Sequence, residues 1–403
     1  MAEPARASDV AVVGGGPAGC SAAIHLARRG ARVVLLEARA YPHDKLCGEF
    51  LSPECAGLLD GLGLTPARQA LGPAAIDTVY LSAPGGAAWH TPLPGTALGL
   101  SRRALDQALA LRTQALGVDL RTGVSVTRID GDLGHGFALR VTGGAGEPLR
   151  ARAVIAAHGR RGALDRALNR RFLQRPAAFV ALKAHFAGPP LPGRIELHGF
   201  EGGYCGMSEI ERGAAPHGRV TNVCLLVREA VFRRAAEAGP EKVPAFIRWM
   251  RGQNPRLDEW FTQATLLDER WLSIAQVPFG PKRPVVAQVL MAGDSAGLIT
   301  PLAGDGIAMA LRGGQMAAGR VLAYLAGQQS AAELCQGYAR DWQREFGARV
   351  RLGRLLQTFL LRPRLLGLGL RLLGAAPALG EYLVRHTRET GDEAASAFAD
   401  GGR

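Results

Sequence analysis

The stretch DVAVVGGGPAGCSAAIHLARRGARVVLLE, residues 9–37, decides the fold of the N-terminal region. An apolar run ends at Gly14, a helix of small residues follows from Cys20 to about Arg29, and a second apolar run ends at Glu37. This order predicts a β-α-β unit with a Gly-x-Gly-x-x-Gly turn between its first strand and its helix. Such a turn is typical of proteins that bind a dinucleotide.

Each part of the turn has a physical role beside a dinucleotide. The first glycine permits a tight turn, the second lets the backbone approach the pyrophosphate, and the third lets the helix pack closely on the strand. The start of the helix offers free N–H groups to the phosphates. Glu37, 18 residues after the third glycine, is placed to accept hydrogen bonds from a ribose. The residues expected at the cofactor are therefore Gly14, Gly16, Pro17, Ala18, Gly19 and Glu37.

Beyond residue 37 the hydrophobic pattern is mixed α/β. Strands are expected in a hairpin over 76–89, in several runs over 118–156, over 179–186, 195–200, 203–211 and 220–227, and over 285–291. Helices are expected over 100–116, over much of 229–265, and after Asp294 to about Leu325. No repeat of 20–50 residues interrupts this order.

Further stretches carry a resemblance to a known group of proteins. They are Ser101-Arg102-x-x-Leu105-Asp106, Ala156-Ala157-His158-Gly159, and Ala292-Gly293-Asp294-Ser295-Ala296-Gly297 followed by Pro301 and Gly304-Asp305-Gly306. Together with residues 12–37 they resemble the flavoprotein superfamily of p-hydroxybenzoate hydroxylase, geranylgeranyl reductase and the flavin-dependent halogenases. The resemblance covers most of residues 8–325 and implies that the cofactor is FAD.

The resemblance assigns expected roles to several residues. Asp294 would bind the ribityl or ribose hydroxyls of FAD, and Arg102 would lie near the FAD phosphates. The glycine-rich turn before the next helix would place N–H groups at the flavin pyrimidine ring, where a helix N-terminus stabilises negative charge. The expected cofactor residues of this second group are Arg102, Gly293, Asp294, Pro301, Gly304, Asp305 and Gly306.

The chain departs from the family pattern in two places. Family monooxygenases usually carry Asp-Gly where this chain has His158-Gly159, which weakens the expectation of a hydroxylase mechanism. A second Gly-x-Gly-x-x-Gly turn with a following acid is missing from the sequence. Electrons would therefore come from a transiently bound NAD(P)H, from a quinol or from a partner protein.

Candidate catalytic residues are Cys47, Tyr204 and Lys45. Cys47 lies in a segment, 41–53, that is similar to the Cys-Gly-rich segment of geranylgeranyl reductases, where the cysteine faces the isoalloxazine. Tyr204 lies in a glycine-rich strand, which often marks a close approach of a ligand. For Cys47 and Tyr204 a purely structural role, as a buried thiol or as a packed ring, is an equal alternative. Lys45 and Lys183 are the candidate lysines for halogenase chemistry.

The expected architecture is a doubly wound, Rossmann-like FAD-binding domain with an inserted β-sheet domain. The FAD-binding domain is expected from residues 1–72, 101–170 and 281–330, the β-sheet substrate domain from 73–100 and 171–280, and a basic helical tail from 331–403. The substrate site is expected between the two domains, over the flavin ring.

Four functions compete for this architecture. A reductase or dehydrogenase acting on a lipid-, isoprenoid- or polyketide-like molecule is slightly favoured by the Lys45-x-Cys47-Gly48 segment. A monooxygenase that hydroxylates an aromatic substrate comes next, then a halogenase, because the halogenase motif Trp-x-Trp-x-Ile-Pro is missing from the sequence. A non-catalytic, flavin-loaded scaffold belongs to a different class.

Composition limits the partners. The net charge is +13, but the basic charge is almost all arginine and forms no block interleaved with aromatic residues, so nucleic acid is not expected. Six cysteines without a Cys-x-x-Cys pair predict reduced thiols and no metal site. Without an apolar leader or an 18-residue apolar run, we expect a cytoplasmic protein, either free or peripheral at the inner face of a membrane.

The basic tail, residues 340–388, supplies the argument for the membrane alternative. Its leucines fall at helical spacing, and Pro363 and Pro377 are expected to divide it into about three short helices. These helices would either pack their leucines on the body of the protein or lay them into a lipid surface. Packing is slightly favoured.

Overall fold

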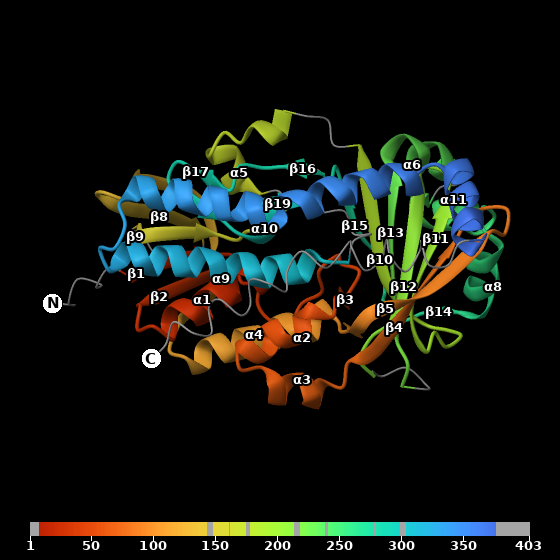
Figure 1. The fold of residues 1–403 in the computed structure, drawn as a ribbon, viewed down its shortest axis with the longest axis horizontal. Helices are drawn as coiled ribbons and strands as arrows, with labels where there is room; N and C mark the ends of the chain where they lie inside the picture. The colour runs from red at the N-terminus through yellow and green to blue at the C-terminus, as the bar shows by residue number, and fades with distance from the viewer. Residues whose placement is uncertain are drawn as a thin grey trace.

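A computed structural model describes residues 8–142, 148–160, 162–174, 178–212, 218–237, 241–277, 279–298 and 304–375. Within these residues the strands form two large sheets and one small pair. The two large sheets lie end to end in Figure 1, and the long helices α9 (Gly306–Leu325) and α10 (Ala331–Leu360) run along them. The fold is the expected α/β class with a Rossmann-like first half.

The first sheet is mostly parallel. Its order is β17 (Val285–Val286), β18 (Val289–Met291), β9 (Leu149–Ala156), β1 (Ser8–Val13), β2 (Val33–Glu37) and β6 (Asp119–Thr122), with β7 (Ser125–Asp132) and β8 (Gly136–Thr142) joined to it as a hairpin. The central strands are parallel and buried, as their near-continuous apolar runs predict.

Helices cover the first sheet at close range. The helix α1 (Pro17–Ala27) packs against α9, and a side chain at Gly314 of α9 would collide with the Ala18 carbonyl. The small residues of the two helices therefore allow their backbones to approach. The other helices here are α2 (Glu54–Gly61), α3 (Thr65–Leu71), α4 (Arg102–Ala115), α5 (Ala163–Ala167) and the short 3-10 turns Arg171–Gln174 and Gly293–Ser295.

The second sheet is mostly antiparallel. Its order is β14 (Thr265–Leu266), β10 (Phe179–Ala187), β13 (Thr221–Arg228), β12 (Gly203–Glu209), β11 (Gly193–Phe200), β4 (Ala74–Ser82), β5 (Ala88–Gly99) and β3 (Phe50–Leu51), and β15 (Leu272–Ala275) also pairs with β10. The small pair is β16 (Gly280–Pro281) with β19 (Gly297–Leu298). The predicted hairpin over 76–89 is confirmed by β4 and β5.

Side chains alternate between the two faces of this sheet. One face, with Leu182 and Val223 among its residues, packs on the aromatic side of α6 (Glu229–Ala236), α7 (Lys242–Arg251) and α8 (Pro255–Gln263). The opposite face, with Ala181 and Tyr204, packs on the end of α10 and on α11 (Pro363–Ala375). Figure 1 shows α11 at the outer side of the second sheet.

Two expected elements differ. Residues 285–291 form two short strands, because Ala287 and Gln288 adopt left-handed conformations and turn the chain back on itself. The predicted division of the tail at Pro363 is confirmed, but the helix before it has 30 residues and is not short. A continuous apolar stripe from Leu334 to Val350, buried in the core, keeps this helix intact. Pro363 begins α11 as expected, and Pro377 lies outside the described residues.

Candidate functional site: a cavity between the two sheets

A cavity of about 530 Å³ lies at the carboxyl ends of the central parallel strands. This is the edge at which doubly wound sheets bind their ligands, and the volume is typical of small-molecule sites. Its wall combines the Gly14 turn, the end of β2, the segment 44–47, the start of α4, residues 157–160, the turn at 292–294, and the start of α9. Segments far apart in the sequence thus meet around one space.

The glycine turn has the geometry expected for a dinucleotide. Gly14 has φ +102°, and a Cβ there would lie 2.4 Å from the Ala157 carbonyl oxygen. A side chain at Gly19 would collide with the Gly14 carbonyl, which explains the third glycine. The buried Glu37 accepts hydrogen bonds from the N–H of Gly15 through Oε2 (2.7 Å) and of Arg39 through Oε1 (3.2 Å). Arg39 also lines the cavity and was missed in the sequence.

Two cationic groups converge on Gly16. A Cβ built on Gly16 would lie 3.6 Å from Nη2 of Arg102 and 3.9 Å from Nζ of Lys45. Both cations also contact Asp106, Arg102 through two hydrogen bonds of 2.8 and 2.7 Å and Lys45 at 3.5 Å. Lys45 was expected among the catalytic residues, but it lies at the glycine turn, 3.7 Å from Glu37 Oε2. This position favours a role at the phosphates.

The residues present fit the FAD that the resemblance implies. The N-terminus of α1 has no capping side chain at Gly16, so its first N–H groups face the place where two cations meet. At the opposite wall, Nδ1 of His158 is buried and makes no hydrogen bond to the residues that the structure describes. A long anionic cofactor with many acceptor atoms would satisfy both features.

The second motif lines the other end of the cavity. Gly293 has φ +60°, and Asp294 accepts a hydrogen bond from Nε of Arg160 at 3.2 Å. Gly304 lies against the ring of Phe50, where a Cβ would be only 2.7 Å away. The helix α9 then begins, with Asp305 at its N-cap and with Gly306 on the cavity wall. Pro301 lies outside the described residues.

The departure at His158 has a structural counterpart. Nε2 of His158 lies 3.0 Å from Oδ1 of Asp165, which also accepts a hydrogen bond from Nη1 of Arg170 at 3.0 Å. Burial raises the pKa of Asp165, but these two partners outweigh burial and hold its pKa below the usual range. A carboxylate is thus supplied by α5, behind the histidine rather than in its place.

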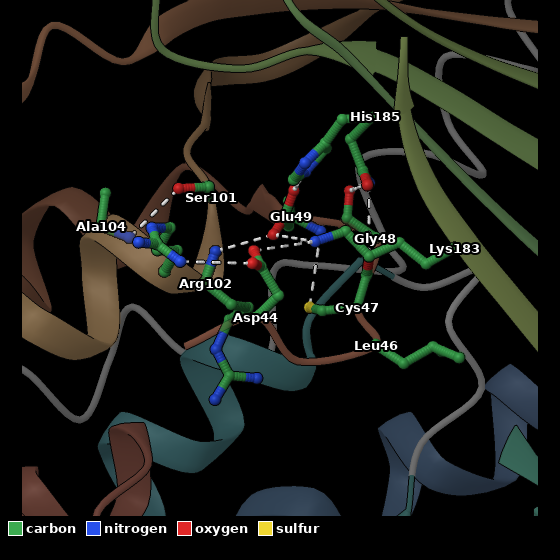
Figure 2. A network of polar contacts seen from close by, with 12 residues as sticks. Asp44, Leu46, Cys47, Gly48, Glu49, Ser101, Arg102, Ala104, Lys183 and His185 are labelled. Atoms are coloured by element: carbon green, nitrogen blue, oxygen red, sulfur yellow. Dashed lines mark hydrogen bonds and ion pairs between the residues drawn. The ribbon is translucent and has the colours of Figure 1, made fainter. Parts of the chain in front are cut away.

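A buried charge cluster joins the segment 44–49 to β10 of the second sheet (Figure 2). Glu49 is fully buried and accepts hydrogen bonds from Nζ of Lys183 (2.6 Å) and from the backbone N–H of Arg102 (2.8 Å) through Oε1. Nε2 of His185 lies 2.7 Å from its Oε2. Lys183 and His185 come from β10, and their spacing of two residues places them on the same face of the strand. That spacing indicates a shared face in the sequence, but it does not reveal Glu49 as the partner.

The cluster reaches toward solvent and toward the cavity. Asp268 accepts a hydrogen bond from the backbone N–H of His185 at 2.8 Å, and Oδ1 of Asp44, on the cavity wall, lies 3.9 Å from Lys183. Burial lowers the pKa of His185, but Asp268 and Glu49 outweigh it and raise this pKa to about 9. Burial raises the pKa of Glu49, but His185 and Lys183 outweigh it and lower this pKa below its usual value.

The structure places Cys47 and Tyr204 differently. Cys47 lies on the cavity wall, where its Sγ accepts a hydrogen bond from the Glu49 N–H at 3.4 Å. Asn222 of β13 holds the same loop by donating to the carbonyl oxygens of Cys47 (3.3 Å) and Gly48 (2.8 Å). Tyr204 is buried in an apolar cluster and is not among the described residues that line the cavity. Cys47 and Lys45 thus line the cavity, and the catalytic roles of Cys47, Lys45 and Tyr204 stay predictions.

The apolar cluster adjoins the cavity. Leu46, Val277 and Leu298 belong to both. From there the cluster extends over the second sheet through Ala181, Tyr204, Leu226, Leu197, Ala83 and Trp89 to Leu360, Leu366 and Leu370 of α10 and α11. One end of the cavity is therefore charged and the other end is continuous with an apolar layer.

Comparisons with known proteins agree with this geometry. Residues 7–202 match the family model described as FAD binding domain. The chain is 27% identical over 332 residues to menaquinone reductase of Mycolicibacterium smegmatis, covering 77% of this chain and 75% of that protein. It is 26% identical over 349 residues to digeranylgeranylglycerophospholipid reductase 2 of Methanopyrus kandleri, covering 84% and 83%.

A solved structure shows the same fold. The flavin-dependent brominase Bmp2 superposes with a TM-score of 0.78 at 20% identity and covers 94% of this chain and 93% of its own. The cofactor is therefore FAD, and the chain is an oxidoreductase. Among the described residues, no helix is both long and apolar enough to cross a membrane.

Proposed function

We propose that the chain reduces a carbon–carbon double bond in a hydrophobic, lipid-like molecule. The premise is that it belongs to the FAD-dependent oxidoreductases related to menaquinone reductase, geranylgeranyl reductases and flavin halogenases. The named reductases support a reductase, and the brominase supports the fold alone.

The observation that carries the proposal is the two-ended cavity. Its charged end combines the glycine turn with Arg102 and Lys45, which suits the phosphates of FAD. Its other end opens on Leu46, Val277 and Leu298 and continues into the apolar cluster on the second sheet. An apolar wall favours a substrate whose reacting part is hydrocarbon, because burying charged or strongly polar groups there is costly.

We also assign the cofactor residues within this proposal. Gly14 to Gly19, Glu37, Arg102 and Lys45 would hold the adenosine and the phosphates, and Gly293, Asp294 and the start of α9 would hold the ribityl chain and the flavin ring. When bound and reduced, FAD supplies a hydride to one carbon of the double bond. An external two-electron donor, either a nicotinamide or a reduced partner protein, must regenerate the reduced form.

The protein must supply the second hydrogen as a proton. Cys47 is placed to donate it, because its thiol lies on the cavity wall beside the apolar end, on a loop fixed by Glu49 and Asn222. The Glu49 cluster orients this loop and excludes water from behind it. Donation leaves a thiolate, which must take a proton from solvent before the next turnover.

The test uses the purified holoprotein, reduced without oxygen. We expect it to reoxidise when mixed with a geranylgeranyl lipid, and to yield a product heavier by two hydrogens in mass spectrometry. Cys47→Ala should retain FAD and flavin reduction but lose product formation. A reduced flavin that no unsaturated lipid reoxidises would contradict the proposal.

Reaction with oxygen tests the alternative, a monooxygenase or halogenase. The reduced protein is mixed rapidly with oxygenated buffer, in the presence and absence of aromatic substrates. A reductase should return to oxidised flavin slowly and without a transient absorption band. A transient band, with oxygen or halogen incorporated into an aromatic product, would favour the alternative.

A further inference from the structure

We propose that α11 and the C-terminal end of α10 dock the protein on an anionic lipid surface. The surface is defined here as the α11 face, which consists of Leu365, Leu368 and Leu372 with the neighbouring Leu355 and Phe359 of α10. The docking itself is independent of the reaction, whereas the route for substrate described below rests on the proposed function.

The helix α11 is apolar on two opposite sides. Leu366 and Leu370 face inward and are buried in the apolar cluster. Leu365, Leu368 and Leu372 are 39%, 58% and 59% exposed. At 3.6 residues per turn these three leucines fall within an arc of about 60°. Five of the six leucines in this 13-residue helix therefore serve two surfaces, one inside the protein and one outside it.

The end of α10 enlarges the outer surface. Leu355 is 68% exposed and Phe359 is 38% exposed, and they are four residues apart on one side of the helix. The ring of Phe359 lies against Gly369 of α11, at a position where any Cβ would collide with it. The glycine thus allows the exposed apolar residues of the two helices to adjoin each other.

Charge complementarity selects the occupant. Residues 346–375 contain six arginines and no aspartate or glutamate. Arg349 pairs with Glu54, whereas the other five, Arg351, Arg354, Arg362, Arg364 and Arg371, are exposed and take part in none of the ion pairs found among the described residues. By helical geometry Arg364 and Arg371 lie about 40° to 60° to one side of the exposed leucines.

A helix with leucines on one arc and arginines beside them suits the boundary between lipid tails and phosphates. The leucines would enter the acyl region, and the guanidinium groups would meet the negative headgroups. A second copy of this chain would bring the same five arginines against each other, which like-charge repulsion opposes. Nucleic acid would leave the leucines in water.

The inner side of α11 links membrane docking to the entry of a lipid-like substrate. Leu366 and Leu370 cover the apolar cluster that continues to Leu46 and Leu298 on the cavity wall. A lipid-like substrate entering under α11 would have to part this packed, largely apolar cluster to reach the cavity. The same helix would face the membrane outside and the substrate path inside.

The experiment is co-sedimentation of the full-length holoprotein with vesicles. One set of vesicles contains phosphatidylcholine alone, and the other contains phosphatidylcholine mixed with phosphatidylglycerol. We expect binding to the mixed vesicles that weakens as salt is raised. The double variants Leu368→Gln/Leu372→Gln and Arg364→Gln/Arg371→Gln should each lower the affinity about tenfold or more.

The matched controls are Leu111→Gln on α4, where the leucine is 58% exposed like Leu368, and Arg166→Gln on α5. Both should bind as the unaltered protein does, and all variants should keep their FAD absorbance as a sign of folding. Equal binding to both kinds of vesicle, no binding at all, or an unchanged affinity of the leucine variant would each overturn the proposal.

Sedimentation velocity without lipid tests whether the α11 face instead joins two copies of the protein. If the unaltered protein self-associates and the leucine variant does not, while neither binds vesicles, the α11 face joins two copies instead and the proposal is overturned. Failure of the reductase can be told apart from failure of docking, because turnover is measured on a detergent-dispersed lipid and docking is measured on vesicles without substrate.

Discussion

Two fully buried carboxylates, Asp106 and Glu49, both bind Arg102 of the cavity wall and are held in different ways. Asp106 of α4 binds Arg102 and Lys45. Glu49 binds Lys183 and His185 of β10. Arg102 connects the two, because its guanidinium binds Asp106 and its backbone N–H binds Glu49. Each site therefore joins one buried anion to two cationic groups.

The difference lies in where the partners come from. Arg102 is four residues before Asp106 on the same helix, so that ion pair forms with the helix itself. The partners of Glu49 are 134 and 136 residues away, on β10 of the second sheet. In the proposed function the Asp106 site would present cations to FAD, whereas the Glu49 site ties the loop that carries Cys47 to the second sheet. Local pairing serves binding, and distant pairing serves the assembly of the active site.

The largest effect on stability is expected from disrupting the Glu49 site. Glu49→Gln keeps the shape of the side chain but leaves the Lys183 ammonium buried without its closest anion. Removing one partner of a buried ion pair costs about 3–5 kcal/mol, so the free energy of unfolding should fall by that amount. Urea unfolding of the holoprotein at saturating FAD measures it.

A double-mutant cycle sharpens this result. In a Lys183→Met background the same Glu49→Gln change should cost clearly less, because the uncompensated charge has been removed as well. A loss below about 1 kcal/mol in the unaltered background would mean that water reaches the cluster and that it does not hold the Cys47 loop to the second sheet.

The fold was predicted best where one stretch of chain determines its own structure. The β-α-β unit of residues 9–37, the hairpin of β4 and β5, and the helix after Ser101 all follow from local periodicity and turn residues. The turn at Ala287 and Gln288 was missed, because two non-glycine residues with positive φ carry no turn signal. The length of α10 was missed because packing in the core, not propensity, extends it.

The functional site shows the same difference between features set by local sequence and features set by tertiary contacts. The glycine turn, Arg102 and the start of α9 reach the cavity as expected, since motif and position are local. Lys45 was expected in the chemistry, but its place beside Gly16 depends on how the loop folds back across α4. The pairing of His158 with Asp165 and that of Glu49 with β10 depend on tertiary contacts, which a single sequence does not reveal.

The next largest effect is the pH dependence of the free energy of unfolding. It should depend on the Glu49 site, which contains His185, and not on the Asp106 site. The pKa of His185 is raised from 6.5 to about 9 in the folded protein, so folding favours its protonated form. The stabilisation is fully present below pH 6.5 and is lost as pH rises through about 9. Unfolding free energies measured from pH 6 to 9.5 should therefore fall, by about 3 kcal/mol at most.

His185→Gln is the control for this dependence. It removes the titrating ring but keeps a side chain that can donate to Glu49, so the protein should be less stable at pH 6 and its stability should change little up to pH 9.5. The same slope in the variant and in the unaltered protein would assign the pH dependence to another group. The Asp106 site has no histidine among its ion-pair partners, so Asp106→Asn should leave the slope unchanged.

The smallest effect is expected from weakening the contact between Arg102 and Asp106. It should appear in the affinity for FAD rather than in the stability of the protein. Arg102→Lys keeps the charge and the backbone N–H that binds Glu49, but it loses the two-pronged contact with Asp106. The cation near Gly16 would then be poorly positioned, and titration of the FAD-free protein with FAD should show an affinity about tenfold weaker, or about 1.4 kcal/mol. Arg112→Lys, on the same helix but bonded to the Leu62 carbonyl, should bind FAD normally. Equal losses in both variants would mean that the effect comes from α4 as a whole, and the division between a binding carboxylate and an assembling one would fail.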